Sequence, residues 1–220
     1  MKIALLTLTR DRLAYTQHCF NSIQQHARVD YDHWVLDQGS EDGTVDWLRD
    51  HTNCRLIESP TNLGICKGLN LMLDTLDPAE YDVLVRFDND CEVLQPYTLS
   101  TCAGLALDHG VICSPHVLGL NAPPKTFDPV QVGDHIIDQT AVLGGIFMAM
   151  PAWLFSEDGY RYDESRHPHS GDELIVPWHR ARGGTAGYVR GFHVNHYETS
   201  KGQAATHPDY WARKTLEMAA

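Results

Sequence analysis

Two aspartates, Asp88 and Asp90, are separated by one residue and follow directly after the apolar run of residues 83–87. Alternate residues of an extended segment point to the same side, so both carboxylates should face one spot. Hard oxygen ligands of this kind suit Mg²⁺ or Mn²⁺. A solvated acidic turn after a strand would contain the same residues, and such short triplets are common. The pair alone is therefore weak evidence for a metal site.

A second acidic pair, Asp172 and Glu173, follows Gly171 where a helical pattern begins and runs to residue 182. Carboxylates in the first turn of a helix interact favourably with the helix dipole in any protein. A positioned carboxylate can also accept a proton from a hydroxyl, which is general base catalysis. The pattern is compatible both with stabilisation of the helix start and with general base catalysis.

Near the chain end, His193 and His196 belong to an alternating segment, so they cannot both face the same side of a strand. One of the two could therefore reach a site that the other cannot. A cation, Lys67, lies about one turn inside the helix that follows Asn62-Leu63-Gly64, where it could reach a bound diphosphate. Arg10 and Arg12 are candidates of the same kind and rank below Lys67.

The elements that would position these residues follow from the apolar pattern. Strand-like runs cover residues 3–8, 33–36, 55–57, 83–87 and 111–114, and helical patterns cover residues 13–26, 44–49, 69–76 and 97–107. This alternation predicts one α/β domain with a mainly parallel central sheet flanked by helices. Residues 115–129 are rich in proline and predict a surface loop or lid.

In a parallel sheet, ligands bind outside the carboxyl ends of the strands. We therefore expect the polar residues that follow the first four strands to converge on one edge. These residues are Thr9, Arg10, Asp37, Asn62, Asp88 and Asp90.

The chain's composition sets outer limits on its function. The 220 residues fit one domain with a substantial core, and the net charge is −12 with scattered basic residues. This balance suits a small-molecule donor and disfavours a nucleic-acid acceptor without excluding one. No apolar stretch reaches the ~20 residues of a membrane helix, and six widely spaced cysteines without a C-x-x-C pair predict reduced thiols in a cytoplasmic protein.

The order of several motifs resembles the inverting family 2 glycosyltransferases, which have the GT-A fold. The motifs are Asp37-Gln38-Gly39-Ser40-Glu41-Asp42-Gly43-Thr44, Asn62-Leu63-Gly64, Asp88-Asn89-Asp90, Gly144-Gly145 and Gly171-Asp172-Glu173. The resemblance covers roughly residues 2–200. We expect a GT-A domain over residues 1–200 and a C-terminal helical tail over residues 201–220.

The resemblance implies a role for each matching residue. Thr9 and Asp37 would contact the nucleotide base, and Asp88 the ribose and metal. Asp90 would hold the metal and diphosphate, and His196, by family position, would be a third metal ligand or a diphosphate contact. Gly145 would let the backbone approach the donor sugar. The family base is the second residue of its acidic pair, which is Glu173 by position and Asp172 by residue type.

The sequence thus predicts a metal-dependent inverting glycosyltransferase that moves one sugar from a nucleotide diphosphate sugar, with a UDP-sugar favoured, to a glycan or another hydroxyl-bearing acceptor. Loss of Asp90 should then barely change stability. One alternative is a non-catalytic nucleotide-sugar or glycan-binding protein of the same fold. Another is a sugar-phosphate nucleotidyltransferase, which is disfavoured because no glycine-rich loop follows the first strand.

Overall fold

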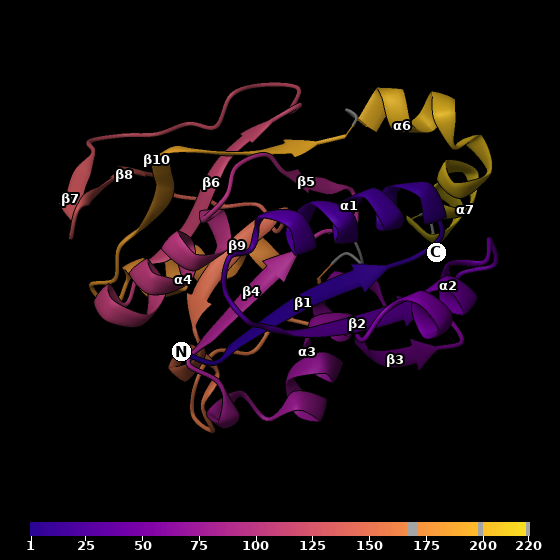
Figure 1. Cartoon of the computed structure of the whole chain (residues 1–220), viewed down its shortest axis with the longest axis horizontal. Helices are drawn as coiled ribbons and strands as arrows, with labels where there is room; N and C mark the ends of the chain where they lie inside the picture. The colour runs from indigo at the N-terminus through magenta and orange to yellow at the C-terminus, as the bar shows by residue number, and fades with distance from the viewer. Residues whose placement is uncertain (167–170, 198–199, 219–220) are drawn as a thin grey trace.

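A ten-stranded mixed sheet forms the centre of the computed structural model, which describes residues 1–166, 171–197 and 200–218 (Figure 1). The strands are β1 Ile3–Thr9, β2 Asp32–Gln38, β3 Arg55–Ser59, β4 Val83–Phe87, β5 Cys91–Val93, β6 Ile112–Leu118, β7 Val130–Val132, β8 His135–Gln139, β9 Phe147–Pro151 and β10 Ala186–His196. The α-helices are α1 Leu13–His26, α2 Thr44–His51, α3 Gly64–Leu76, α4 Thr98–His109, α5 Ile175–Arg180, α6 Ser200–Thr206 and α7 Pro208–Met218. Short 3₁₀ helices are η1 Pro78–Glu80, η2 Ala152–Phe155 and η3 Asp172–Leu174.

The sheet order is β3-β2-β1-β4-β9-β6-β10-β8-β7, and β5 pairs with β10. Strands β1 to β4 are parallel to one another, as the βαβ pattern predicted. Beyond β4 the sheet is mixed, because β9 runs antiparallel to both β4 and β6 while β10 is parallel to β6. The predicted α/β class is confirmed, with parallel pairing concentrated in the first half of the chain.

Helices cover both faces of the sheet, which explains why β1 reads as a nearly continuous apolar run. Leu5 packs in the core cluster that contains residues of α1 and α4. The next residue, Leu6, packs in a second cluster with residues of α3 and η2. Successive side chains of a strand point to opposite faces, so β1 supplies both cores.

Local signals fix where several helices begin and end. Gly43 has φ 90° before α2, and Asp42 accepts the N–H of Thr44 at 3.1 Å. Gly110 ends α4 in the left-handed region with φ 66° and donates its N–H to Ala106. Glycine adopts such conformations without steric cost.

The helical pattern assigned to residues 69–76 is too short at its start. Helix α3 begins at Gly64 and contains Lys67, as expected for a helix that follows the Asn62-Leu63-Gly64 turn. Strand β6 continues to Leu118, inside the stretch predicted as a loop, and β7 and β8 follow in residues 130–139. Pro115 is tolerated in β6 because its partner on β10, Val189, lies at a register shift where the ladder is interrupted.

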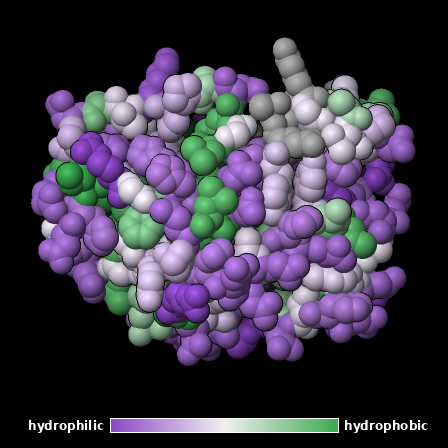
Figure 2. Space-filling model, turned by 45° about the horizontal axis from the view of Figure 1, so that its top comes forward, coloured by the Kyte–Doolittle hydropathy of each residue, from purple (hydrophilic) through white to green (hydrophobic). Residues whose placement is uncertain are grey.

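Helices α6 and α7 follow β10, and α7 lies beside the carboxyl end of β1 (Figure 1). On the face shown in Figure 2, the surface is mostly hydrophilic with small groups of hydrophobic residues. Across the described part of the chain, the helices are too short or too polar to cross a membrane.

Candidate active site

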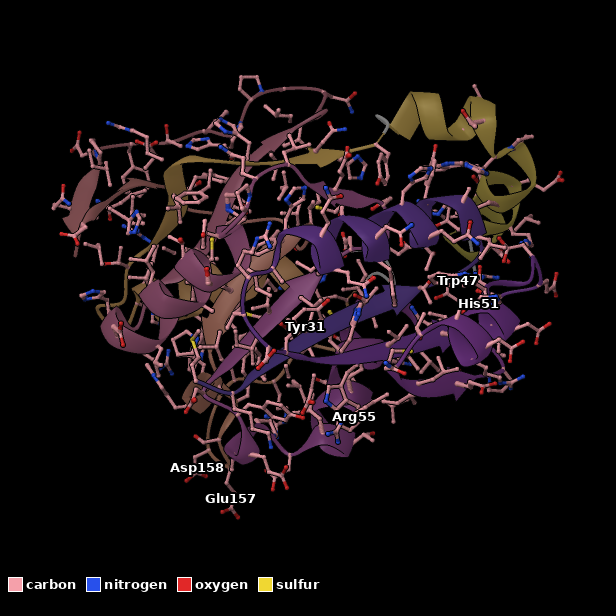
Figure 3. The ribbon with its side chains drawn as sticks, in the orientation of Figure 1. Tyr31, Trp47, His51, Arg55, Glu157 and Asp158 are labelled. Carbon is pink, nitrogen blue, oxygen red and sulfur yellow. The ribbon has the colours of Figure 1, made fainter. Side chains whose placement is uncertain are left out.

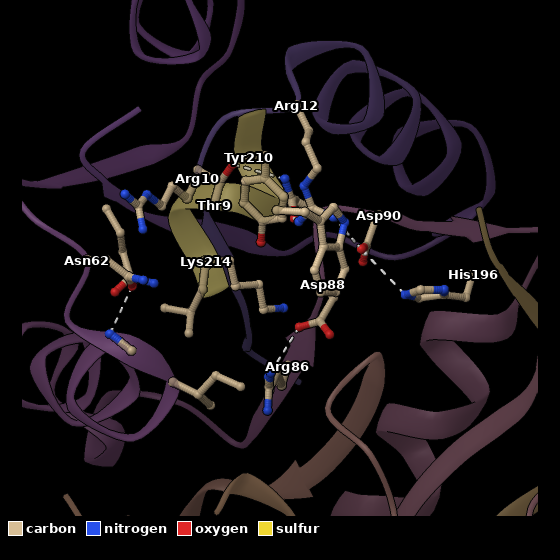
Figure 4. Close-up of a pocket in the computed structure, with 16 residues that line it drawn as sticks. Thr9, Arg10, Arg12, Asn62, Arg86, Asp88, Asp90, His196, Tyr210 and Lys214 are labelled. Atoms are coloured by element: carbon tan, nitrogen blue, oxygen red, sulfur yellow. Dashed lines mark hydrogen bonds and ion pairs between the residues drawn. The ribbon is translucent and has the colours of Figure 1, made fainter. Parts of the chain in front are cut away.

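The carboxyl ends of the parallel strands surround a pocket of about 220 Å³ (Figure 4). Its lining comes from the ends of β1, β2, β4 and β10, the start of α3, and α7. The lining residues are Leu8, Thr9, Arg10, Arg12, Gln38, Asn62, Gly64, Ile65, Arg86, Asp88, Asn89, Asp90, His196, Tyr210, Trp211 and Lys214. Of the residues expected to converge at the strand ends, Thr9, Arg10, Asn62, Asp88 and Asp90 line this pocket and Asp37 does not. His196, expected from the family resemblance, lines it as well.

Asp90 lies beside an arginine and a histidine. Its Oδ2 accepts a hydrogen bond from Arg12 at 2.7 Å and lies 3.4 Å from Nε2 of His196 (Figure 4). The side chains of Arg12 and Asp90 are only 8% and 9% exposed. Burial is the largest single effect and lowers the pKa of Arg12, but Asp90, Tyr210 and Asp88 together outweigh it and the net shift is upward. The pair is thus a buried ion pair on the pocket wall.

The turn between β1 and α1 aims Arg12 at Asp90. Asp11 and Arg12 have φ values of 53° and 60°, so two consecutive non-glycine residues adopt the left-handed region. Each such residue costs on the order of 1–3 kcal/mol and persists only where its surroundings enforce it. Here Asp11 accepts the N–H of Glu41 at 2.8 Å, and its own N–H bonds to Ser40 Oγ at 2.7 Å.

Asp88 is oriented by a different arginine. Nη2 of Arg86, a residue 4% exposed in β4, donates to Oδ1 of Asp88 at 3.0 Å. The Arg86 guanidinium lies against Gly145, where an added Cβ would come within 1.9 Å of it. Gly145 itself is not part of the pocket lining. Its predicted place beside the donor sugar stays a prediction, while the structure shows that its missing side chain makes room for Arg86.

Asn89, between the two aspartates, points into the protein. Its Nδ2 donates to the hydroxyls of Thr9 at 3.1 Å and Thr16 at 3.0 Å, and its Oδ1 accepts from Arg12. These bonds tie the loop after β4 to β1 and α1. The three residues Asp88-Asn89-Asp90 are therefore fixed by their neighbours before any ligand binds.

Asn62 shapes the entrance to α3. Its Oδ1 accepts the N–H of Gly64 at 3.0 Å, and Oε1 of Gln38 accepts the N–H of Leu63 at 2.9 Å. Asn62 and Gln38 both line the pocket. Lys67 is exposed and does not line it, whereas the lower-ranked Arg10 and Arg12 do.

Asp37 is 1% exposed and orders the turn after β2. Its carboxylate accepts the N–H groups of Gly39 at 3.1 Å and Ser40 at 2.9 Å. Burial raises the pKa of Asp37 against the opposing effect of these hydrogen bonds. Asp37 lines a neighbouring surface cavity with Ser59 and Pro60 instead of the main pocket, so its contact with a nucleotide base stays a prediction.

Glu173 caps the turn in which it lies, since its Oε2 accepts the N–H of Gly171 at 2.9 Å. It is half-buried and does not line the pocket. The backbone of Asp172 belongs to η3, but its side chain lies outside the described part of the chain. The base role of the pair stays a prediction.

The two histidines separate as the alternation predicted. His196 lines the pocket. His193 does not: its backbone N–H donates to Gln95 at 2.7 Å, and its ring lies 6.0 Å from that of His116.

Helix α7 supplies pocket residues that the sequence gave no reason to choose. Tyr210, Trp211 and Lys214 all line the cavity. The Arg12 guanidinium carbon lies 4.6 Å from the centroid of the Tyr210 ring, and Nζ of Lys214 lies 4.5 Å from that of Trp211. Only the three-dimensional docking of the tail brings these residues to the strand ends.

The donor set on the pocket wall fits Mn²⁺ or Mg²⁺ in its chemistry. Asp88 and Asp90 offer carboxylate oxygens and His196 an imidazole nitrogen, which are ligands that Mn²⁺ accepts. The described residues contain no preformed group of three such side chains placed to hold an ion.

Several solved structures resemble this chain in fold. A mannosyltransferase from Pyrobaculum calidifontis in complex with GDP-Man and Mn²⁺ has a TM-score of 0.66 at 14% identity, over 93% of this chain and 59% of that one. GalNAc-T7 with UDP, GalNAc and Mn²⁺ has a TM-score of 0.67 at 14% identity, over 91% of this chain and 44% of that one. TarS 1-349 from S. aureus in complex with UDP-GlcNAc has a TM-score of 0.65 at 15% identity, over 89% of this chain and 58% of that one.

At these identities the likeness shows the GT-A fold alone, and the chain spans less than two thirds of each of these proteins. No curated protein matches the chain in sequence. The model of the family described as "Glycosyl transferase family 2" matches residues 5–127, from β1 through the loop after β6. That match covers more than half of the chain and includes the Asp88-Asn89-Asp90 segment, so the chain belongs to glycosyl transferase family 2.

Proposed function

We propose that the chain transfers a single sugar from a nucleoside diphosphate sugar to an acceptor hydroxyl, with inversion at the anomeric carbon. The observation that carries this proposal is the charge of the pocket. Arg10, Arg12, Arg86 and Lys214 line it together with two carboxylates, although the chain has a net charge of −12. Cationic groups gathered in one cleft favour a phosphorylated ligand.

The nucleoside would lie toward β1 and α3. Thr9, Gln38 and Asn62 line that side of the pocket and present hydroxyl and amide groups. Structural neighbours are described in complex with UDP, UDP-GlcNAc and GDP-Man, so both UDP- and GDP-sugars deserve testing. We favour a UDP-sugar.

The proposal includes a divalent cation, Mn²⁺ or Mg²⁺, with Asp88, Asp90 and His196 as the residues that would hold it. When bound, the ion would neutralise charge on the leaving diphosphate. Two of the similar structures are described with Mn²⁺. Arg12 and Arg86, which pair with Asp90 and Asp88, also line the pocket, where a guanidinium group can bind a phosphate oxygen.

The acceptor hydroxyl needs a base because it is a poor nucleophile while it keeps its proton. We assign this base to Glu173, with Asp172 as the second candidate. The carboxylate would accept the hydroxyl proton as the acceptor oxygen bonds to the anomeric carbon and the bond to the diphosphate oxygen breaks. Because the attacking and leaving oxygens lie on opposite sides of that carbon, one displacement inverts its configuration.

A donor panel tests the proposal. UDP-, GDP- and dTDP-sugars are screened by thermal shift with Mn²⁺ and with a chelator, and each is then assayed for released nucleotide. We expect one donor class to raise the melting temperature in a metal-dependent manner and to release its nucleoside diphosphate slowly without an acceptor. Binding without any release would favour the non-catalytic alternative, and no binding would contradict the proposal.

A further inference from the structure

One face of α7 brings two N–H donors to the pocket. Trp211 and Lys214 are three residues apart on the helix, so their side chains lie on the same face, and both line the cavity. The indole Nε1 of Trp211 is buried and has no hydrogen-bond partner among the residues that the structure describes. A buried donor without an acceptor is costly, and a small shift of the Trp211 ring, which already lines the pocket, would let an oxygen atom of a ligand satisfy it.

The Lys214 ammonium is placed beside this donor. Its Nζ lies 4.5 Å from the centroid of the Trp211 ring and 5.9 Å from that of Tyr210, so two aromatic rings hold it over the pocket. Figure 4 shows Lys214 facing the side of the cavity where Asp88 and Arg86 lie. A lysine on this wall adds positive charge opposite the residues expected to bind the diphosphate.

Ion pairs fasten α7 to the turn before α1 and to the loop before α2. Arg213 bonds to the carboxylates of Asp11 and Glu41, the latter at 2.8 Å. Tyr210, which also lines the pocket, lies against the Arg12 guanidinium. A cavity of about 810 Å³ separates this part of α7 from the start of α1. The helix is thus held over the pocket by a few polar contacts, of which the Arg213 pairs are the most direct.

We propose that Lys214 and Trp211 bind the diphosphate of the donor and that Arg213 is a positioning residue that keeps α7 over it. This inference rests on the proposed function, because it assumes a nucleoside diphosphate donor. The Lys214 ammonium interacts with the phosphate charge, and the Trp211 indole donates to a phosphate oxygen. Donor affinity therefore depends on a segment outside the part of the chain matched by the family model.

The test is calorimetric titration of the full chain with UDP, UMP and uridine, and with GDP and GMP as a second pair. Lys214→Ala should weaken diphosphate binding at least ~10-fold and monophosphate binding less than ~3-fold, because it removes a charge that faces mainly the second phosphate. Trp211→Phe, which keeps an aromatic ring, should weaken diphosphate binding roughly 3- to 10-fold. The matched controls are Lys125→Ala, at an exposed lysine, and Trp153→Phe, at a tryptophan that is 61% exposed.

The Arg213 variants test whether this residue keeps α7 in place over the pocket. Arg213→Ala should weaken diphosphate binding and increase amide hydrogen exchange across α7, and Arg213→Lys should restore part of both. Circular dichroism melts confirm that each variant is folded. If the parent chain binds neither UDP nor GDP, the proposed function fails and this inference fails with it. If the parent binds and Lys214→Ala binds equally well, the proposed function stands and this inference alone is overturned.

Discussion

Asp90 is the residue on which the charge balance of the pocket most depends. Its carboxylate is almost fully buried and faces both Arg12 and His196. A carboxylate placed in this way has two effects, since it can hold a cation in the pocket and it also compensates a buried guanidinium. The sequence indicated the first effect and gave no sign of the second.

We therefore predict that Asp90→Ala destabilises the protein as well as abolishing turnover, which corrects the expectation from sequence that stability would barely change. Removing one member of a buried ion pair typically costs about 3–5 kcal/mol. Chemical denaturation measures the loss, and Asp90→Ala combined with Arg12→Met should recover much of it. Glu58→Ala, which breaks an exposed pair with Arg49, should change the free energy of unfolding far less. Equal effects at the two sites would contradict the account.

Glu173 allows a substitution that separates structure from catalysis. Its Oε2 accepts the Gly171 N–H, and the amide oxygen of glutamine can accept the same bond. Glu173→Gln should therefore keep stability and donor affinity while turnover falls by about 10² to 10⁴, the range for a positioned base. Asp172→Asn is the matched variant and should have the smaller effect. A Glu173→Gln enzyme with parental turnover would remove Glu173 as the base.

The elements differ in how clearly the sequence specified them. Strands β1 and β4 are buried on both faces, so their apolar runs were readable without ambiguity. Strand β9, Phe147–Pro151, contains methionine and alanine, which favour helices as much as strands, and its position is decided by pairing with β4. Strand β7 has three residues, too few for a periodic signal. Tertiary pairing, absent from any local window, determined these elements.

Strand β2 contains a histidine that should make stability depend on pH. The His33 ring stacks on Phe20 with centroids 4.3 Å apart, and its Nε2 lies 3.0 Å from Thr7 Oγ1. Removal from water lowers the pKa of His33 from its ordinary value of 6.5 to about 3. Below pH 6.5 the unfolded chain takes up a proton that the folded chain refuses, so stability falls as the pH decreases from 6.5 toward 3.

Between pH 7 and 5 this linkage amounts to at most about 2 kcal/mol. Urea denaturation at both pH values should show the loss, and His33→Phe, which preserves the stacking on Phe20, should reduce the difference. His51→Gln changes an exposed histidine on α2 beside Trp47 (Figure 3) and should leave the difference intact. If His33→Phe leaves the pH dependence unchanged, another group is responsible.

Across the whole molecule, the fold gathers several of the few basic side chains in one pocket, although the chain has a net charge of −12. The convergence of strand ends in a parallel sheet predicted Thr9, Arg10, Asn62, Asp88 and Asp90, which line this pocket, and also Asp37, which lines a neighbouring cavity. His196 was expected from the family resemblance alone. The sequence could not predict Lys214 or Trp211, which reach the pocket through the docking of a helix more than a hundred residues away from Asp90. Arg86 could not be predicted as a pocket residue for another reason. It lies within an apolar strand, and the sequence does not indicate which face of the sheet its side chain occupies.

The most direct test of the account is time-resolved proton NMR of the sugar released or transferred from an α-linked nucleoside diphosphate sugar, using the donor that the panel identifies. The anomeric proton of the first product reports both that the glycosidic bond to the diphosphate was cleaved and which face was attacked. The account predicts that the β-anomer forms first, before mutarotation, and that Glu173→Gln slows its appearance by about 10² to 10⁴. An α-linked first product would contradict a single inverting displacement at this pocket.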